Sequence, residues 1–412
     1  MFKRVAGTKD ILPDEAGHWQ AIETTARNTF SLFNYREIRT PIIEDAALFN
    51  RTLGSTTEIV QKQMFLIQNQ PDVYALRPEG TASIARSYLE NNLDKTSAFI
   101  KLYYIGPMFR LERPQKGRLR QFHHIGCEAI GSQEAALDVE VISLADQLLK
   151  GFAITDYKIK INSLGCAEDK ERLSLNLKQG LQKEEQNLCP DCRLRIQKNI
   201  LRVLDCKNDG CQKIVKQLEF KNSHLCQDCL NHFEKVRSGL DSLGIAYQIQ
   251  PQLVRGLDYY NRTVFEITHP DLGAQDAIGA GGRYNNLIKE LGGPDTSGIG
   301  FAFGVERLLL ASKLGEEKPL NKLTYLITLG DAAKEAGIKI LNQLRSYGIA
   351  CEMDYLSRSL KSAMRAANDL NADYVLILGE DELKKNVISL KEMSGGSQRE
   401  INIQDLTKEL KC

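Results

Sequence analysis

What the sequence lacks excludes several classes of protein. No apolar run approaches the length of a membrane-spanning helix, and the first residues, MFKRVAGTKDILPDEAG, lack the apolar core of a secretory signal. The 54 basic side chains are balanced by 53 acidic ones, which argues against a general nucleic-acid coat but allows local basic patches. The chain has no internal repeat and no low-complexity tract. We therefore expect a cytoplasmic globular protein with no membrane partner.

Cysteine, in contrast, is plentiful for a cytoplasmic chain, at ten residues. Six of them fall in one polar segment, namely Cys189, Cys192, Cys206, Cys211, Cys226 and Cys229. In a reducing compartment this clustering indicates metal binding or burial before disulfides. The pairs Cys189/Cys192 and Cys226/Cys229 have the spacing of two zinc knuckles, whose four thiolates would close a tetrahedral structural site. Cys206 and Cys211 lack that spacing, and plain burial of the thiols stays open as the alternative.

Hydrophobic periodicity predicts helices that pack on an antiparallel sheet. Residues 15–33 place five apolar side chains on one helical face, and residues 137–148 repeat the pattern. Short β-rich pieces lie between them, which is typical of an α+β arrangement. From about 167 to 243 the chain becomes polar, Cys-rich and helix-permissive, and we interpret this segment as an insertion into the sheet domain.

The last ninety residues have a different pattern of predicted strands and helices. The polar stretch at 312–322 is a candidate linker. Beyond it, the strands YLITLG, IACEMD and YVLILG alternate with helical patterns at about 332–347 and 359–371. This alternation predicts a small α/β domain with parallel strands.

Residues 110–120 concentrate positive charge. The basic side chains are Arg110, Arg113, Lys116, Arg118 and Arg120, with Glu112 as the one carboxylate. The flanking residues favour two antiparallel strands, with Pro114 and Gly117 at the tip of the basic loop between them. An arginine fork binds phosphate oxygens at any working pH. A solvated, salt-bridged hairpin is the alternative, and this stretch alone leaves both open.

Three further segments carry more polar chemistry than folding requires. In LRPEGT, Glu79 lies between proline and glycine, so that it either accompanies a helix cap at Thr81 or binds an ammonium group. In VRGLDYYNR, strand propensity explains neither the arginines nor the paired tyrosines. In GIGFAFGVERL, Arg307 falls on the first turn of a helix, which suits a phosphate, although an ordinary β–α junction would look the same.

These segments together resemble a known family. GPMFRLERPQKGRLRQFHHIGCE, LVRGLDYYNRTVFE and GIGFAFGVERL are similar to motif 2, the histidine-specific motif and motif 3 of histidyl-tRNA synthetases. AGGRYNNL resembles the second histidine-specific segment of that family, and LRPEGT resembles its amino-acid-binding loop. The C-terminal α/β pattern resembles the anticodon-binding domain of class IIa synthetases. The resemblance runs essentially from end to end.

The resemblance implies a fold and an activity. The fold would be an antiparallel-sheet class II catalytic domain at 1–320, interrupted by the helical insertion at 167–243, and then an anticodon-binding α/β domain at 324–412. The enzyme would activate histidine with ATP and Mg²⁺ and transfer it to tRNA(His). It would be a homodimer, with motif 1 around REIRTPIIE at the interface.

The resemblance also assigns roles to residues that handle ATP. Arg110 and Arg255 are the implied catalytic residues, which contact the α-phosphate from opposite sides. Arg307 would bind the γ-phosphate, and Glu112 would complete the ATP-binding set. Phosphoryl chemistry of this kind needs positioning and charge stabilisation rather than a covalent intermediate.

For histidine, the implied partner of the ammonium group is Glu79, and Glu128 with Tyr260 would serve the imidazole. The rest of the implied histidine pocket is Gly80, Thr81, His124 and Tyr259. For tRNA, Arg113 and Gln115 match loop positions that contact the acceptor end, including its extra 5′ guanosine. Lys116, Arg118 and Arg120 keep a general electrostatic role.

Two departures from the family pattern stand out. His124 occupies the position of a usual glutamine, and a neutral imidazole cannot both donate and accept from adjacent atoms as an amide does. Its role as a substrate contact is therefore left open. Asn285 and Asn286 replace a common Asp-Gly, which we expect to be a tolerated turn variant.

Two rival functions fit the sequence less well. A non-catalytic paralogue, like the regulatory subunit of ATP phosphoribosyltransferase, would be expected to lose the catalytic arginines and the terminal domain, and this chain keeps both. A class IIa synthetase for threonine or proline is disfavoured by RGLDYYNR and by Glu128.

Overall fold

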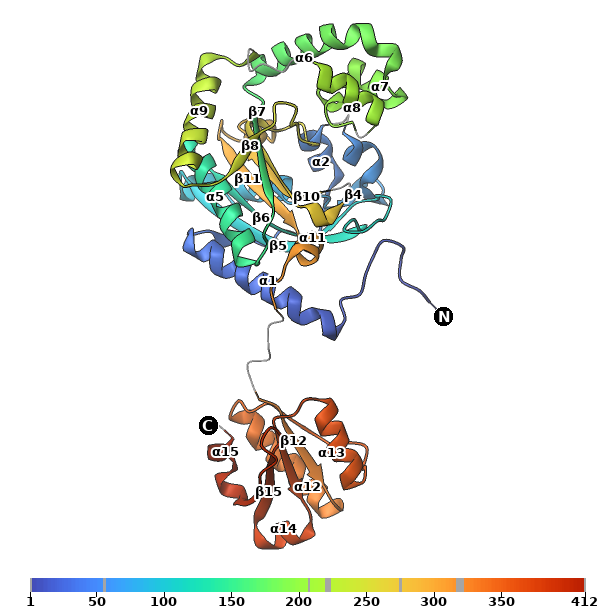
Figure 1. Ribbon diagram of the computed structural model, residues 1–412, viewed down its shortest axis with the longest axis vertical. Helices are drawn as coiled ribbons and strands as arrows, with labels where there is room; N and C mark the ends of the chain where they lie inside the picture. Colours follow the sequence, from blue (N-terminus) through green and yellow to red (C-terminus); the bar gives the residue numbers. More distant parts are fainter. Residues whose placement is uncertain are drawn as a thin grey trace. The chain divides into compact units, whose positions relative to one another are not determined.

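The chain forms two compact units, Met1–Glu317 and Lys318–Cys412 (Figure 1). The computed structural model describes residues 2–54, 57–206, 208–218, 224–273, 276–315 and 322–410. Most of the linker expected at 312–322 falls at 316–321, outside the described residues. Among the described helices, none combines the length and apolar character needed to cross a membrane.

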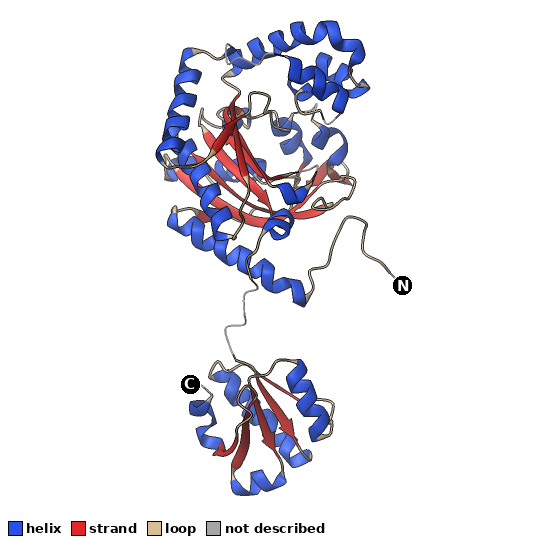
Figure 2. Ribbon diagram, viewed as in Figure 1, coloured by secondary structure: helices blue, strands red, loops and turns tan. Residues whose placement is uncertain are grey.

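An eight-stranded sheet is the frame of the first unit (Figure 2). Its six central strands pair antiparallel, and a short strand joins each edge in parallel. The order is β1 (Arg36–Glu37), β5 (Ile100–Phe109), β6 (Gln121–Ile130), β11 (Gly298–Gly304), β10 (Ala277–Arg283), β9 (Asn261–Thr268), β7 (Lys158–Ser163) and β8 (Tyr247–Ile249). The predicted antiparallel sheet is confirmed, and the basic segment is the loop of the β5–β6 hairpin.

One face of this sheet is covered by long amphipathic helices. They are α1 (Pro13–Leu32), α5 (Ala135–Gly151), α9 (Gln227–Ser242) and the shorter α11 (Val305–Ala311). Helix α1 begins with a proline followed by two acidic residues, and it buries Ile22, Ala26 and Phe30, four residues apart. The helix predicted at 137–148 is α5, which buries Val141 and Leu148 in the same core.

The other face carries a second core and the cavity described below. Aromatic side chains such as Phe49, Tyr88 and Tyr284 pack there between the sheet and the helices. The covering elements are α2 (Ala46–Leu53), the π-helical turn η1 (Ile59–Gln63), α3 (Thr81–Glu90), α4 (Leu93–Thr96), α10 (Leu287–Glu290) and a small antiparallel sheet of β2 (Ile43–Asp45), β4 (Asp72–Leu76) and β3 (Phe65–Asn69). A 3₁₀ turn at Pro270–Leu272 joins β9 to β10.

The secondary structure of the insertion, among its described residues, consists of helices joined by short loops. Its elements are α6 (Ala167–Leu181), η2 (Gln182–Asn187), α7 (Pro190–Lys198), η3 (Ile200–Val203) and α8 (Asp209–Gln217), followed by α9. The pieces from α6 to α8 share a small core of their own, whereas α9 packs with α5 in the core of the sheet (Figure 1). The predicted helical insertion is confirmed.

The second unit is an α/β domain with a five-stranded sheet. The strand order is β13 (Cys351–Met353), β12 (Thr324–Thr328), β14 (Tyr374–Leu378), β15 (Val387–Glu392) and β16 (Gln398–Asn402). The helices are α12 (Asp331–Ser346), α13 (Leu360–Asp369), α14 (Glu380–Lys385), η6 (Ile403–Asp405) and α15 (Leu406–Glu409). The three predicted strands are parallel. Strands β15 and β16 add an antiparallel hairpin that was not predicted from the sequence.

A buried ion pair ties β10 to helix α5. Arg283 is fully buried, and its guanidinium donates to Asp138 at 2.6–3.0 Å and to the carbonyls of Ser132 and Glu134 at 2.8 Å. All three nitrogens of the guanidinium therefore donate hydrogen bonds, as burial of a charge requires.

Replacing this arginine leaves the Asp138 carboxylate buried without its main partner. We expect Arg283→Met to lower the free energy of unfolding by about 3–5 kcal/mol in a denaturant titration. Lys289→Ala, which breaks the exposed pair with Asp295, should change it by less than about 1 kcal/mol. Equal effects of the two substitutions would contradict this account of the pair.

Candidate active site

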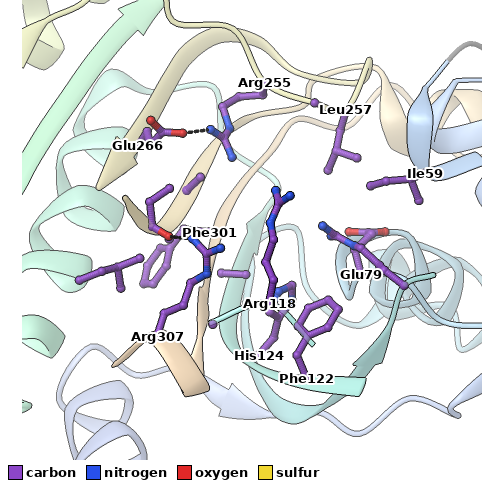
Figure 3. A pocket seen from close by; sticks show the side chains of 18 of the residues that line it. Ile59, Glu79, Arg118, Phe122, His124, Arg255, Leu257, Glu266, Phe301 and Arg307 are labelled. Carbon is purple, nitrogen blue, oxygen red and sulfur yellow. Dashed lines mark hydrogen bonds and ion pairs between the residues drawn. The ribbon is translucent and has the colours of Figure 1, made fainter. Parts of the chain in front are cut away.

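A cavity of about 370 Å³ opens above the sheet on the side of α2 and α3. It collects residues from all four of the segments singled out in the sequence, including Glu79, Arg110, Arg255 and Arg307. Figure 3 shows the guanidinium groups of Arg118, Arg255 and Arg307 pointing into this space from different elements, with Glu79 on the opposite side. The cavity thus has a cationic part and an acidic part.

The arginines of the cationic part are held by the protein. Arg255 Nη1 lies 2.5 Å from Glu266 Oε2 on β9. Arg307 Nε donates to the Gly117 carbonyl at 3.0 Å, which fastens helix α11 to the tip of the basic loop. Arg110 Nε donates to the Pro78 carbonyl at 2.9 Å. Arg307 Nη1 also donates to the Ala277 carbonyl. For Arg110 and Arg255 the anchor named uses one nitrogen of the guanidinium, so other donors can face an anion in the cavity.

Glu112 and Arg118 complete this part of the wall. The Glu112 carboxylate lies 3.1 Å from Arg118 Nε and 3.8 Å from Arg110 Nη1. Burial lowers the pKa of both Arg110 and Arg307, and nearby cations contribute to the lowering. A polyanion in the cavity would relieve that unfavourable crowding of positive charge.

In the acidic part, Glu79 caps a helix. Its carboxylate oxygens accept hydrogen bonds from the backbone N–H groups of Thr81 and Ala82, both at 2.8 Å, at the start of α3. The hydroxyl of Tyr259 lies 3.4 Å from the same carboxylate. Burial raises the pKa of Glu79, although these backbone donors oppose the rise. Glu79 rather than Thr81 is therefore the capping side chain, which leaves the Thr81 hydroxyl for another partner.

That partner is Glu128, which lies just behind the cavity wall. Its two oxygens accept from the hydroxyls of Thr81 and Tyr284, each at 2.6 Å. Burial raises the pKa of Glu128 to about 8, despite these two hydrogen bonds. Gly300 on the neighbouring strand is needed here, because a Cβ at that position would lie 2.0 Å from a Glu128 oxygen.

His124 lies at the base of the cavity beside Phe122 (Figure 3). Burial, together with Arg110 and other nearby cations, lowers the pKa of His124 to about 3. Its buried Nδ1 has no hydrogen-bond partner among the described residues. The imidazole is therefore neutral, with a ring nitrogen left for a ligand. His123, the preceding residue of the strand, points away and contacts Glu306 at 3.0 Å.

Comparison with known proteins agrees with this geometry. A family model described as histidyl-tRNA synthetase matches residues 7–308, and one described as an anticodon binding domain matches residues 324–412. The chain belongs to the histidyl-tRNA synthetase family. It is 48% identical to the histidine–tRNA ligase of Halothermothrix orenii, over 99% of this chain and 98% of the relative. It is 45% identical to that of Desulforamulus reducens, with 99% of each chain covered.

The fold agrees with solved members of the histidyl-tRNA synthetase family. The crystal structure of the apo S. aureus histidyl-tRNA synthetase superposes with a TM-score of 0.83 at 34% identity, and both chains are fully covered. A structure titled ATP phosphoribosyltransferase regulatory subunit/histidyl-tRNA synthetase, from Bacillus halodurans, gives 0.64 at 22% identity over 92% of this chain and 97% of that one. The latter likeness concerns the fold alone.

Within this synthetase fold, the predicted residues separate into three groups. Lining the cavity are Glu79, Thr81, Arg110, Glu112, His124, Arg255, Tyr259, Tyr260 and Arg307. Arg113 and Gln115 are exposed on the hairpin loop, and Gly80 and Glu128 lie behind the wall.

Four residues at the site were not assigned roles in it from the sequence. Tyr104 and Tyr284 are buried tyrosines near the cavity, and Glu266 pairs with Arg255. Arg118, for which a general electrostatic role was expected, lines the cavity itself. The strand alternation of β9 could have placed Glu266 on the face of the cavity. Tyr284 follows the glycine run of β10, where no local pattern marks it as a partner of Glu128.

The cysteine quartet expected from the two knuckles is wrong. Two separate clusters form among the described residues, one with Cys189 and Cys192 and the other with Cys226 and Cys229. The first is completed by Cys206 and Cys211, and the second by Cys166 and Asp169. The spacing of the cysteines in the sequence did not predict which pairs come together, because this depends on how the short helices pack.

The neutral state of His124 in this synthetase fold has a measurable consequence. Between pH 6.5 and about 3, the unfolded chain binds a proton at His124 that the folded chain does not, so the residue costs stability as pH falls. Relative to His124→Gln, the wild-type free energy of unfolding should therefore fall by about 1 kcal/mol per pH unit below 6.5. Denaturant titrations from pH 7 to 5 measure this difference, and a pH-independent difference would contradict the assignment.

Proposed function

We propose that the chain is a histidine–tRNA ligase, which forms histidyl-adenylate and pyrophosphate from histidine and ATP and then transfers histidine to the 3′ end of tRNA(His). The observation that supports this most is the division of one cavity into two parts. Buried carboxylates lie in or just behind the wall of one part and suit a ligand rich in N–H groups. The other part holds Arg110, Arg118, Arg255 and Arg307, which suit a triphosphate.

Arg110 and Arg255 are the proposed catalytic residues. In this proposal they meet the α-phosphate from two sides while the histidine carboxylate attacks it, and Arg307 binds the γ-phosphate. Glu112 keeps Arg110 and Arg118 within reach of the nucleotide. Preorganised cations of this kind stabilise the charge that develops in the transition state without reorganising during the reaction.

ATP is expected with Mg²⁺, and the cavity can accommodate the ion. Glu266 and Asp276 supply carboxylates in the wall near the arginines, and Mg²⁺ prefers carboxylate and phosphate oxygens. These residues would hold the ion together with the nucleotide, and the ion would supply further neutralisation of phosphate charge.

Histidine recognition belongs to the acidic part. Glu79 would accept the ammonium group, and Glu128 with Tyr260 would pair with the imidazole. Gly80 admits the ring of Tyr104 to the pocket wall, since a Cβ at residue 80 would lie 2.4 Å from that ring. Thr81, His124 and Tyr259 complete the pocket. An apolar amino acid would leave a buried carboxylate unpaired, which is a strong basis for rejection.

The tRNA is proposed to approach over the hairpin loop and the second unit. Arg113 and Gln115 are exposed, as residues that contact a macromolecule must be. The assignment of 1–320 as the catalytic domain and 324–412 as the anticodon-binding domain is part of this proposal, supported by the family match over 324–412.

A homodimer is proposed as the working assembly, located in the cytoplasm, where tRNA is charged. The expected interface around REIRTPIIE includes Ile42 and Ile43, which are 41% and 52% exposed in the single chain. Leu66 and Ile67 of the adjoining small sheet are also exposed. An apolar surface of this kind is suited to contact with a second copy.

ATP–pyrophosphate exchange with each amino acid in turn tests the function. Exchange with histidine alone is the expected result. Exchange with another amino acid would overturn the specificity, and exchange with none would favour a regulatory paralogue that shares the fold.

Glu128→Gln tests the proposed contact to the imidazole. The amide can keep contacts to Thr81 and Tyr284, but it cannot ionise to pair with an imidazole N–H, so we expect the KM for histidine to rise about 10- to 100-fold while the KM for ATP changes little. Glu44→Gln, another buried carboxylate that pairs with Arg86 outside the cavity, is the matched control. Exchange assays with varied histidine decide; a rise confined to the KM for ATP would exclude this role.

Arg113→Ala tests the division of labour on the hairpin. Because the side chain is exposed and outside the cavity, its loss should reduce aminoacylation of tRNA(His) by about tenfold and leave histidine-dependent exchange almost unchanged. Lys116→Ala, on the same loop, controls for the general loss of positive charge. Equal losses in charging and exchange would show that Arg113 does not act on tRNA.

A further inference from the structure

Four cysteines of the insertion converge on one point. Cys189, Cys192, Cys206 and Cys211 place their sulfur atoms within 4.8 Å of one another. The Sγ atoms of Cys189 and Cys206 are 3.8 Å apart, and the thiols are free. Four sulfurs at about 2.3 Å from a tetrahedral zinc ion are about 3.8 Å from each other, whereas a disulfide needs about 2 Å. The separation therefore fits a shared metal rather than a disulfide.

The surrounding backbone also fits thiolate ligands. The N–H of Cys189 donates to Cys211 Sγ at 3.2 Å, and the N–H of Asn208 lies 3.4 Å from Cys206 Sγ. Cys189 precedes the first residue of α7, and Cys211 lies on the first turn of α8. Helix N-termini and N–H donors both stabilise a negative sulfur. Thiols that were buried only as apolar groups would not need such donors.

The small size of the helices in the insertion also favours a stabilising metal ion. Its helices α7 and α8 have nine residues each, and η3 has four. Segments this short bury little apolar surface, and small units of this kind are commonly stabilised by a metal or by disulfides. The cysteines lie inside the small core itself, beside Leu188, Val203 and Ile214.

The segment enclosed by these cysteines reaches the catalytic cavity. Arg202 Nη1 donates to the Gly256 carbonyl at 2.6 Å, and Asn199 Nδ2 donates to Asp258 Oδ1 at 3.0 Å. Gly256 and Asp258 belong to the loop that carries Arg255. Arg202 itself lines the cavity. The fold of the cysteine cluster is thus connected, through two hydrogen bonds, to the position of the Arg255 loop.

We propose that Cys189, Cys192, Cys206 and Cys211 bind one structural zinc ion, which fixes the 199–202 segment against the Arg255 loop. The zinc takes no part in the chemistry, and all four ligand positions are filled by thiolate. The second cluster is not included, because Asp169 already accepts from the N–H groups of Cys166 and Cys226 and pairs with Arg172.

Metal content tests the site independently of activity. In protein purified without added metal, the zinc content of the wild type should exceed that of Cys192→Ser/Cys211→Ser by about one equivalent per chain. Cys351→Ser, a buried cysteine of the second unit, should retain the wild-type content. If the double variant does not fold, Cys189→Ser serves instead, since this residue is only half-buried. Less than about a tenth of an equivalent in the wild type, or equal content in variant and wild type, would overturn the proposal.

A second measurement tests the connection to the cavity, and this part rests on the proposed function. Removal of zinc by a chelator should lower histidine-dependent exchange about tenfold, with recovery when zinc is restored. Arg202→Ala should reduce exchange similarly while keeping its zinc. Zinc loss without any change in exchange would overturn the proposed link between the zinc ion and the Arg255 loop, but it would not affect the proposal that the four cysteines bind zinc. If the wild type shows no exchange with any amino acid, the proposed function fails, whatever the metal content.

Discussion

Burial of two carboxylates beside one cavity, Glu79 in its wall and Glu128 just behind it, is the constraint on which the rest of the site depends. Glu79 is 4% exposed and Glu128 is 1% exposed, and neither forms an ion pair with a described residue. Their oxygens are satisfied instead by backbone N–H groups and by hydroxyls. Such groups stabilise a carboxylate less than a cation would, and burial therefore raises the pKa of both. A ligand with an ammonium group and a further N–H would supply the positive charge and the donor that these carboxylates lack in the protein.

The architecture follows from the need to keep these carboxylates apart from the arginines. Glu79 is fixed at the start of α3, Glu128 on β6, and the arginines on the β5–β6 hairpin, on the loop before β9 and on α11. The antiparallel pairing of the central strands brings these distant parts of the chain to one face. Glycines allow the close approach, and Gly300 is the clearest case because a side chain there would displace Glu128.

The helical insertion is connected to the catalytic-site framework by direct contacts. Its short helices pack around cysteines, and Arg202 and Asn199 connect them to the loop of Arg255. An arginine that is proposed to be catalytic and lies on a loop needs such support, because loops are the least rigid part of a scaffold. Glu266 on β9 supplies a second support from the opposite side. The proposed zinc would make the first support as firm as the second.

The sequence by itself determined the α+β class and the helical insertion, because local periodicity encodes them. Its motifs, through their resemblance to a known family, indicated several residues that line the cavity. The sequence pattern also placed Glu79 just before one helix and Arg307 on the first turn of another. The tertiary structure alone decided which cysteines meet, that Tyr284 and Thr81 share Glu128, and that Arg118 faces the cavity. These depend on contacts between residues far apart in the chain, such as Thr81 and Glu128, and no local pattern records which distant partners the packing brings together.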